Sequence, residues 1–202
     1  MLSADEHRRI EAAIREAERH TAGEIVVVIA RQASRYRLVP FLYGLVAALI
    51  APWPLAAWTE LSLTRVLLAQ LAVAVVVVAA LSWPVLRFRL TPRWLQRARA
   101  RDAAEHEFRS RGLADTRGRT GLLLYLAQAE RHAEVIGDLA VAARVEEGAW
   151  RAIIEVLVGA IRRGDVADGL VGAVERMGGI LAEHVPVEAG DADELPNRVV
   201  VL

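Results

Sequence analysis

Two long apolar runs dominate the pattern of hydrophobic and polar positions along the chain. They occupy residues 39–58 and 66–86, and neither run contains a charged residue. A helix of about twenty residues rises about 30 Å, which is the thickness of the hydrocarbon core of a bilayer. Residues 72–80 are apolar on every face, whereas a helix on a protein surface shows a polar stripe. The pattern therefore predicts a transmembrane helical hairpin over residues 38–87, with one pass in each run.

The details of the runs leave alternatives open. Pro52 and Pro54 could kink or shorten the first pass, and that segment could also be re-entrant. A buried helical pair in the core of a soluble protein is the other interpretation. Aromatic residues near the ends of the runs favour a membrane, because aromatic side chains gather at membrane–water interfaces; they are Tyr36, Tyr43, Trp53, Trp58 and Trp83.

The distribution of arginines along the chain predicts the orientation of the hairpin. Several arginines lie within residues 31–37 and 87–101, whereas the connecting segment holds only Glu60 and Arg65. Positive charge is retained on the cytoplasmic side of a membrane. We therefore expect a multi-pass protein of the inner (cytoplasmic) membrane with both termini cytoplasmic. No apolar stretch near the first residues resembles a cleavable signal.

The rest of the chain alternates between helical and strand patterns, and residues 24–30 form a strand that is apolar on both faces. This strand cannot form a hydrophobic core alone. A helix that joins two strands implies a fold in which layers of helices pack against a sheet. We therefore predict one split domain, residues 1–35 and 90–202, as an α/β/α sandwich with a small mixed sheet. Helices are expected at residues 3–20, with a Ser3–Glu6 capping box, and at 91–111, 138–145, 150–163 and 168–184. The other strands are expected at 120–127 and 132–137. After a loose acidic tail, residues 195–202 could add an edge strand.

The amino-acid composition excludes several classes of functional site. The chain has no cysteine, which excludes disulfides, thiolate metal sites and thiol catalysis. Residues 1–101 carry 14 arginines against 7 acidic residues, while residues 102–202 carry 11 against 18. The basic half borders the predicted membrane, where an arginine near anionic lipid contributes about 1 kcal/mol. No clustered basic and aromatic surface lies elsewhere, so we expect no nucleic-acid partner.

Several short motifs resemble the TPM domain family, in its membrane-inserted bacterial form. They are Thr21–Val28, Ala104–Phe108, Gly112-Leu113 with Thr116, Arg119–Ala127, Glu130–Asp138 and Glu194–Asn197. The resemblance implies an α/β/α domain related to proteins of photosystem II repair and to receptor-assembly accessories. Some relatives are reported as acid phosphatases or calcium binders, so the resemblance also raises Ca²⁺ as a cofactor.

The turn at residues 115–121 carries the main candidate site. It reads Asp-Thr-Arg-Gly-Arg-Thr-Gly, with arginines where soluble relatives carry acidic or amide residues. Arg117 and Arg119 could bind phosphate by charge-assisted hydrogen bonds, but no nucleophile with an adjacent base is evident. Asp115 and Asp138 are the weak candidate catalytic acids and metal ligands, although losing the acidic turn removes oxygen ligands that calcium prefers. We favour the interpretation that both arginines lie at a loop surface and that Asp138 caps a helix.

Other polar residues carry less information. Glu24 opens a strand and could pair with an arginine, while the five histidines show no zinc-binding spacing: His7, His20, His106, His132 and His184. We therefore expect a non-catalytic, membrane-tethered interaction or assembly module at the cytoplasmic face. Its partners are the lipid bilayer and an unidentified membrane or cytoplasmic protein. The alternative is a membrane-bound acid phosphatase or divalent-metal-dependent hydrolase that uses the turn residues.

Overall fold

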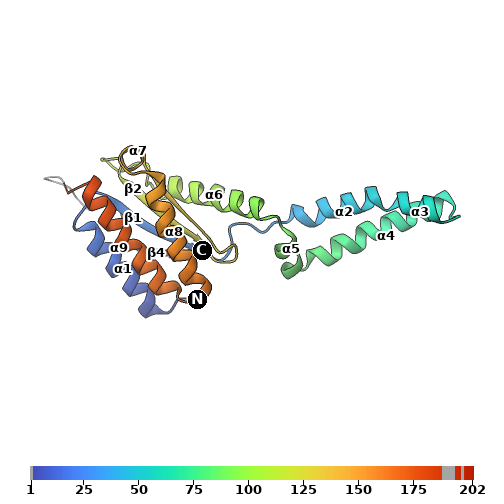
Figure 1. Cartoon of the computed structure of the whole chain (residues 1–202), viewed down its shortest axis with the longest axis horizontal. Helices are drawn as coiled ribbons and strands as arrows, with labels where there is room; N and C mark the ends of the chain where they lie inside the picture. The colour runs from blue at the N-terminus through green and yellow to red at the C-terminus, as the bar shows by residue number, and fades with distance from the viewer. Residues whose placement is uncertain (1, 188–193, 197) are drawn as a thin grey trace. The chain divides into compact units, whose positions relative to one another are not determined.

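The computed structural model describes residues 2–187, 194–196 and 198–202. The chain forms two compact units, residues 1–34 with 97–202 and residues 35–96. Figure 1 labels the helices and strands of both units. Asn197 and residues 188–193 of the acidic tail lie outside the described residues.

A four-stranded mixed sheet lies at the centre of the first unit. Its strands are β1 (Glu24–Ala30), β2 (Gly121–Ala127), β3 (His132–Gly137) and β4 (Val199–Val201), in the order β3-β2-β1-β4. β1 is parallel to β2 and β4, whereas β2 and β3 are antiparallel. The predicted strand at residues 195–202 is confirmed as an edge strand, and among the described residues of that range it spans Val199–Val201.

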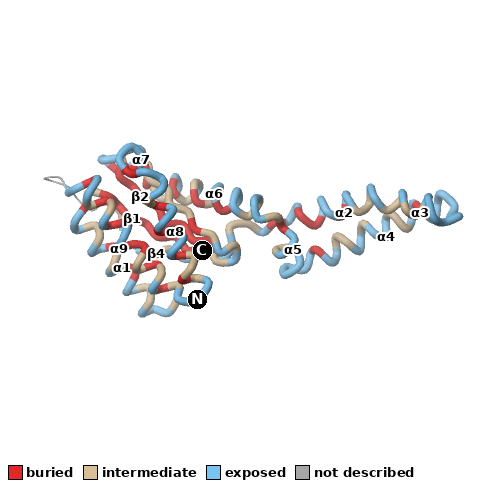
Figure 2. The backbone as a smooth tube through the Cα atoms, in the orientation of Figure 1, coloured by how far each residue is buried: buried red, intermediate tan, exposed pale blue. Residues whose placement is uncertain are grey.

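Helices cover both faces of this sheet, and the predicted α/β/α sandwich is confirmed. One face packs against α1 (Ala4–Glu18), α8 (Glu147–Arg163) and α9 (Val166–His184), with Val27 and Leu124 at the centre of the core. The other face packs against α6 (Arg93–Ser110) through Ala100, Ala104 and Phe108. β1 and β2 are consequently buried along their whole length, as the red tube in Figure 2 shows.

Local sequence signals set the ends of these helices. The Ser3 hydroxyl accepts the N–H of Glu6 at 3.2 Å, and the Glu6 carboxylate accepts the N–H of Ser3 at 2.6 Å. These hydrogen bonds lower the pKa of Glu6 and confirm the predicted capping box. Gly112 follows α6 with a φ of +73°, and Gly164 ends α8 with a φ of +97°. Glycine occupies this left-handed conformation without a steric penalty.

The second unit contains the apolar helices. They are α2 (Leu38–Ile50), α3 (Pro52–Trp58), α4 (Leu63–Ser82) and α5 (Pro84–Leu90). Two stretches, Leu38–Trp58 and Leu63–Ser82, are long and apolar enough to span a membrane. Ala51, between α2 and α3, keeps helical backbone angles, so the first stretch is interrupted at the predicted prolines without leaving helical geometry.

The second apolar helix ends earlier than the sequence pattern predicts. α4 stops at Ser82 instead of continuing to Leu86, because Trp83 adopts an extended ψ of 125°. Pro84 follows directly and disfavours helical angles in the residue before it. The apolar residues after Pro84 therefore belong to the separate helix α5.

Small residues on α2 allow the two long helices to approach closely. A Cβ added to Gly44 would lie 2.4 Å from Cγ2 of Val78 on α4. A small residue on a membrane helix can serve packing inside the hairpin or contact between copies of the chain. At Gly44 the structure favours packing inside the hairpin.

Tyr125 makes the stability of the first unit sensitive to alkaline pH. Its side chain lies in β2 and is 2% exposed. Burial, together with the charges of Glu130 and Glu107, raises the pKa of Tyr125 from 10.0 to about 12. The unfolded chain therefore loses this proton at a lower pH than the folded chain, so the free energy of unfolding falls between pH 10 and pH 12. The slope is at most about 1.4 kcal/mol per pH unit.

Chemical denaturation of the full chain in mild detergent, repeated across this pH range, checks the prediction. The isosteric variant Tyr125→Phe lacks the titrating group and should show a shallower decline than the parent chain. Parallel curves for the two proteins would contradict the assignment of this decline to Tyr125.

Candidate functional site

The candidate turn lies at the edge of the sheet where β1 and β2 begin and β3 ends. Glu24 pairs with Gly121 at the start of the two parallel strands. Asp138 directly follows β3, and its backbone N–H donates to the carbonyl of Gly121 at 2.8 Å. The sheet therefore brings Asp138 beside the turn of residues 115–121, although the two are separated by a complete β-hairpin.

Arg119 and Asp138 form a two-pronged ion pair at this edge. Nε of Arg119 lies 2.6 Å from Oδ2 of Asp138, and Nη2 lies 3.0 Å from Oδ1. The Asp138 side chain is only 5% exposed, whereas that of Arg119 is 48% exposed. The paired carboxylate raises the pKa of Arg119 above its ordinary value, mainly through the hydrogen bond. Arg119 also has a φ of +54°, a conformation that non-glycine residues seldom adopt.

This pair changes the interpretation of Asp138. The residue does occupy the N-cap position of α7 (Leu139–Ala142), but its side chain makes no capping hydrogen bond. Both carboxylate oxygens instead accept from Arg119. The prediction that Asp138 acts as a helix cap is thus correct for the backbone position and wrong for the side chain, because the guanidinium fork satisfies both oxygens.

The two threonine hydroxyls of the turn are also engaged in holding it. Oγ1 of Thr116 accepts the N–H of Thr120 at 3.1 Å, and the hydroxyl of Thr120 donates to the carbonyl of Ala22 at 2.7 Å. Both threonines are buried. Neither hydroxyl is therefore placed as a nucleophile beside a base, and the described residues of this turn hold no third hydroxyl side chain.

A chain of hydrogen bonds through Glu194 ties the far end of the sequence to the turn. The carboxylate of Glu194 accepts the backbone N–H of Arg117 at 3.2 Å, and the N–H of Glu194 donates to the carboxylate of Glu24 at 3.0 Å. Glu24 is 9% exposed. Sequence reasoning did not select Glu194 as a site residue, because no local pattern places it beside a turn so far away in the chain.

The acidic residues of this edge do not form a metal site in the described part of the chain. Asp115 is exposed, and Asp138 is occupied by Arg119. Within the described residues, no group of three or more His, Asp or Glu side chains is arranged to hold a metal ion. The Asp138 carboxylate already accepts from Arg119 and is therefore not available to the oxygen-rich shell that calcium prefers.

Comparison with known proteins gives the family. The model of the TPM domain matches residues 70–180, more than half of the 202-residue chain. The chain belongs to the TPM domain family. The fold agrees with the NMR structure of the BA42 protein from the psychrophilic bacterium Bizionia argentinensis, at a TM-score of 0.62 and 21% identity, over 100% of this chain and 95% of that chain. No curated protein matches the chain.

The histidines of this TPM-domain protein make local contacts. His132 lies 2.9 Å from the carboxylate of Glu134 on the same strand, and His20 lies 3.4 Å from Glu16. His7 bonds the carbonyl of Ser3. None of these three contacts is with another histidine.

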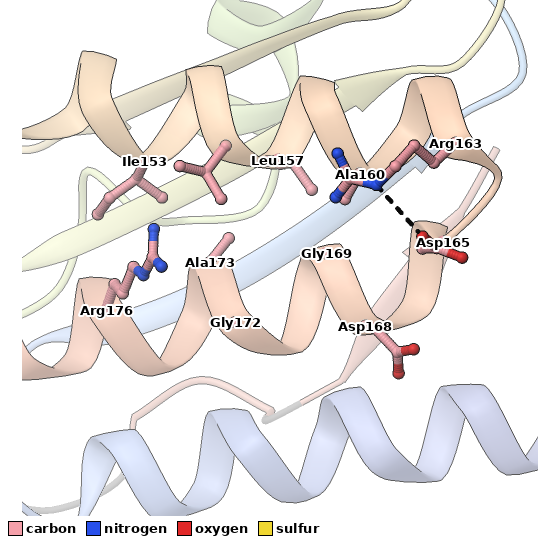
Figure 3. Close-up of a pocket in the computed structure, with 11 residues that line it drawn as sticks. Ile153, Leu157, Ala160, Arg163, Asp165, Asp168, Gly169, Gly172, Ala173 and Arg176 are labelled. Atoms are coloured by element: carbon pink, nitrogen blue, oxygen red, sulfur yellow. Dashed lines mark ion pairs between the residues drawn. The ribbon is translucent and has the colours of Figure 1, made fainter.

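A separate groove lies between α8 and α9 of the TPM-domain protein. It has a volume of about 260 Å³ and is lined by apolar residues of α8, with Gly169, Gly172 and Ala173 on α9. In Figure 3 the Arg176 side chain reaches into the space between the two helices, while Asp168 points away from it. Asp168 pairs instead with Arg9 of α1 at 2.6 Å, and Arg163 pairs with Asp165 at 3.5 Å. Three of the four charged groove residues, Arg163, Asp165 and Asp168, are thus paired with neighbours, and Arg176 is the charge that reaches into the groove.

Replacing Asp138 by alanine tests whether the ion pair holds the turn. We expect the melting temperature of the full chain in detergent to fall by several degrees, because Arg119 keeps an unfavourable backbone conformation and loses its partner. The matched control is Asp115→Ala, which removes an exposed carboxylate from the same turn and should leave the melting temperature unchanged. Equal effects of the two substitutions would contradict a holding role for the pair.

Proposed function

We propose that this TPM-domain protein is anchored in the cytoplasmic membrane by its helical hairpin. The α/β domain then serves at the cytoplasmic face as a non-catalytic interaction or assembly module. The observation that carries the anchoring is the exposure of the apolar helices. Only 17% of the apolar window in Leu38–Trp58 and 6% of that in Leu63–Ser82 is buried.

Water is an unfavourable solvent for such a surface. Phe41, Leu68 and Val76 are each more than 60% exposed, and they lie on both long helices. Soluble monomers expose contiguous apolar patches of only a few hundred Å². A lipid environment stabilises these side chains without any further protein contact.

The non-catalytic part of the proposal rests on how the turn residues are used. The Arg119 guanidinium and the Asp138 carboxylate satisfy each other, and the hydroxyls of Thr116 and Thr120 brace the turn. A phosphatase needs an available nucleophile or an activated water. This arrangement of side chains favours a structural role for the turn.

Cysteine labelling tests the anchoring and its orientation. The chain has no native cysteine, so single variants report one position each. We expect Ser62→Cys, in the connection between α3 and α4, to react with a membrane-impermeant maleimide on intact spheroplasts. Ala12→Cys on α1 and Ser110→Cys on α6 should react only after the membrane is opened. Labelling of either of these positions in intact spheroplasts contradicts the proposed orientation.

The functional class needs a second experiment. Site-specific photocrosslinking from the α/β domain in native membranes should capture a discrete protein partner. Phosphatase assays with added Ca²⁺ or Mg²⁺ should show no turnover by the purified chain. Turnover that is lost in both Asp115→Ala and Asp138→Ala would instead establish the hydrolase alternative.

A further inference from the structure

Arginines are concentrated at one end of the helical hairpin. We call this group the arginine collar, and it consists of Arg35, Arg37, Arg87, Arg89 and Arg93. The first two precede α2, and the other three lie in α5 and at the start of α6. All five belong to the same compact unit.

Specific contacts join the two segments that carry the collar. The rings of Tyr36 and Phe88 meet edge to face with centroids 6.0 Å apart. The hydroxyl of Tyr43 on α2 donates to the carbonyl of Leu90 at the end of α5, at 3.0 Å. The amide of Gln96 donates to the carbonyls of Phe88 and Thr91. The collar is therefore built on a braced piece of structure and not on a free linker.

Within the unit of residues 35–96, no acidic residue accompanies the collar. Between Ala30 and Asp102 the only acidic residue is Glu60, which lies in the connection at the opposite end of the hairpin. None of the five arginines forms an ion pair within the described residues. By contrast, Arg99 and Arg101, further along α6, pair with Asp102 and Glu105. Along the sequence, the arginines without an acidic partner end where the acidic residues of the α/β domain begin.

Exposed aromatic and aliphatic side chains accompany these charges. Trp83 is 68% exposed and Trp94 is 71% exposed, and they flank α5 on either side. Val85, within α5, is 69% exposed. Tryptophan beside arginine is the composition of a segment that lies at the level of lipid headgroups.

We propose that the arginine collar binds the phosphates of anionic phospholipid headgroups at the cytoplasmic leaflet. This inference rests on the membrane anchoring proposed above. Guanidinium groups form charge-assisted, two-pronged hydrogen bonds with phosphate. The collar thereby selects anionic lipid around one end of the hairpin, while Trp83 and Trp94 hold α5 at the interface.

Quenching by brominated lipids can test the selection with the full chain. One reporter keeps Trp83 and Trp94 and replaces Trp53 and Trp58 by phenylalanine. The other keeps Trp53 and Trp58, at the far end of the hairpin, and replaces Trp83 and Trp94. Trp150 stays in both as a constant background. Each protein is reconstituted into phosphatidylcholine vesicles that contain phosphatidylglycerol, with either one of the two lipids brominated.

The collar reporter should show phosphatidylglycerol enriched at least about fivefold over its bulk proportion, the factor expected from a single arginine at an anionic surface. The far-end reporter should show no enrichment. Changing Arg87, Arg89 and Arg93 together to glutamine should lower the enrichment to what Arg35 and Arg37 supply. Changing the same three to lysine, which keeps the charge but not the two-pronged hydrogen bond, should lower it less. A matched control changes the exposed Arg144, Arg151 and Arg162 to glutamine, which alters the net charge equally and should leave the preference intact.

The outcomes separate this inference from the anchoring on which it rests. If brominated phosphatidylcholine quenches neither reporter, the hairpin is not in the bilayer and the anchoring itself fails. If it quenches both reporters but the collar shows no preference for phosphatidylglycerol, the anchoring stands and the collar proposal is overturned. A preference that the glutamine changes leave undiminished, or that the control triple variant lowers equally, overturns it as well.

Discussion

Replacing Gly121 by alanine is expected to lower the free energy of unfolding by about 3 kcal/mol or more. A Cβ at this position would lie 2.3 Å from the carbonyl oxygen of Leu113 and 3.0 Å from its carbonyl carbon. Neither partner can easily move. Gly121 is held between Glu24 in the parallel ladder and Asp138, while Leu113 is completely buried. A typical domain has only about 5–15 kcal/mol of stability, so this loss is a large part of the total.

Two other glycines provide matched controls for this substitution. A Cβ added to Gly148 on α8 or to Gly172 on α9 would meet no atom within 4 Å. Alanine at either position should leave stability unchanged or raise it by up to about 1 kcal/mol, because alanine favours the helix. Chemical denaturation of the full chain in mild detergent compares the three variants. Gly121→Ala as stable as Gly148→Ala would show that the close approach to Leu113 is not required.

Replacing Leu71 by arginine should strongly reduce insertion of the hairpin into the membrane. Leu71 lies near the middle of α4 and is 61% exposed. If α4 spans a bilayer, this side chain therefore lies near the centre of the membrane and contacts lipid. An arginine at the centre of a membrane helix costs about 3 kcal/mol by insertion scales. This cost corresponds to a factor on the order of a hundred in the insertion equilibrium.

The same substitution in the connection between the helices serves as the control. Leu61 lies outside α3 and α4 and is 38% exposed, and Leu61→Arg should insert like the parent chain. Resistance to carbonate extraction, together with labelling of Ser62→Cys from outside, measures insertion. If Leu71→Arg behaves like Leu61→Arg, α4 does not cross a bilayer, since arginine at an exposed position in water costs little.

Most elements of the α/β domain could be predicted from local pattern. The apolar runs that became β1 and β2 are buried on both faces, and that is the condition under which a strand shows no alternation. Ser3 with Glu6, and Gly112 after α6, identified helix ends because capping depends on neighbours a few residues away. The second apolar run was extended too far, since hydropathy alone does not register the backbone restriction before Pro84.

The candidate site was only partly predictable, because its contacts join segments that are far apart in the sequence. Arg119 and Asp138 were both selected from the sequence, but as separate residues with separate roles. Their pairing depends on the β2–β3 hairpin, which returns the chain to the edge where β2 begins. Glu194 was part of a family motif but not a predicted site residue, because its contacts with Glu24 and Arg117 join segments far apart in the chain.

The sequence by itself determined where the chain is apolar, which segments form helices, and which end of the hairpin carries positive charge. These properties follow from side-chain chemistry and short-range backbone geometry. Only the tertiary structure decided that the Asp138 carboxylate binds Arg119 instead of capping a helix, that Gly44 packs against Val78, and that Gly121 must lack a side chain. Each of these depends on which strands and helices become neighbours, and that arrangement minimises the free energy of the whole chain rather than of any one segment.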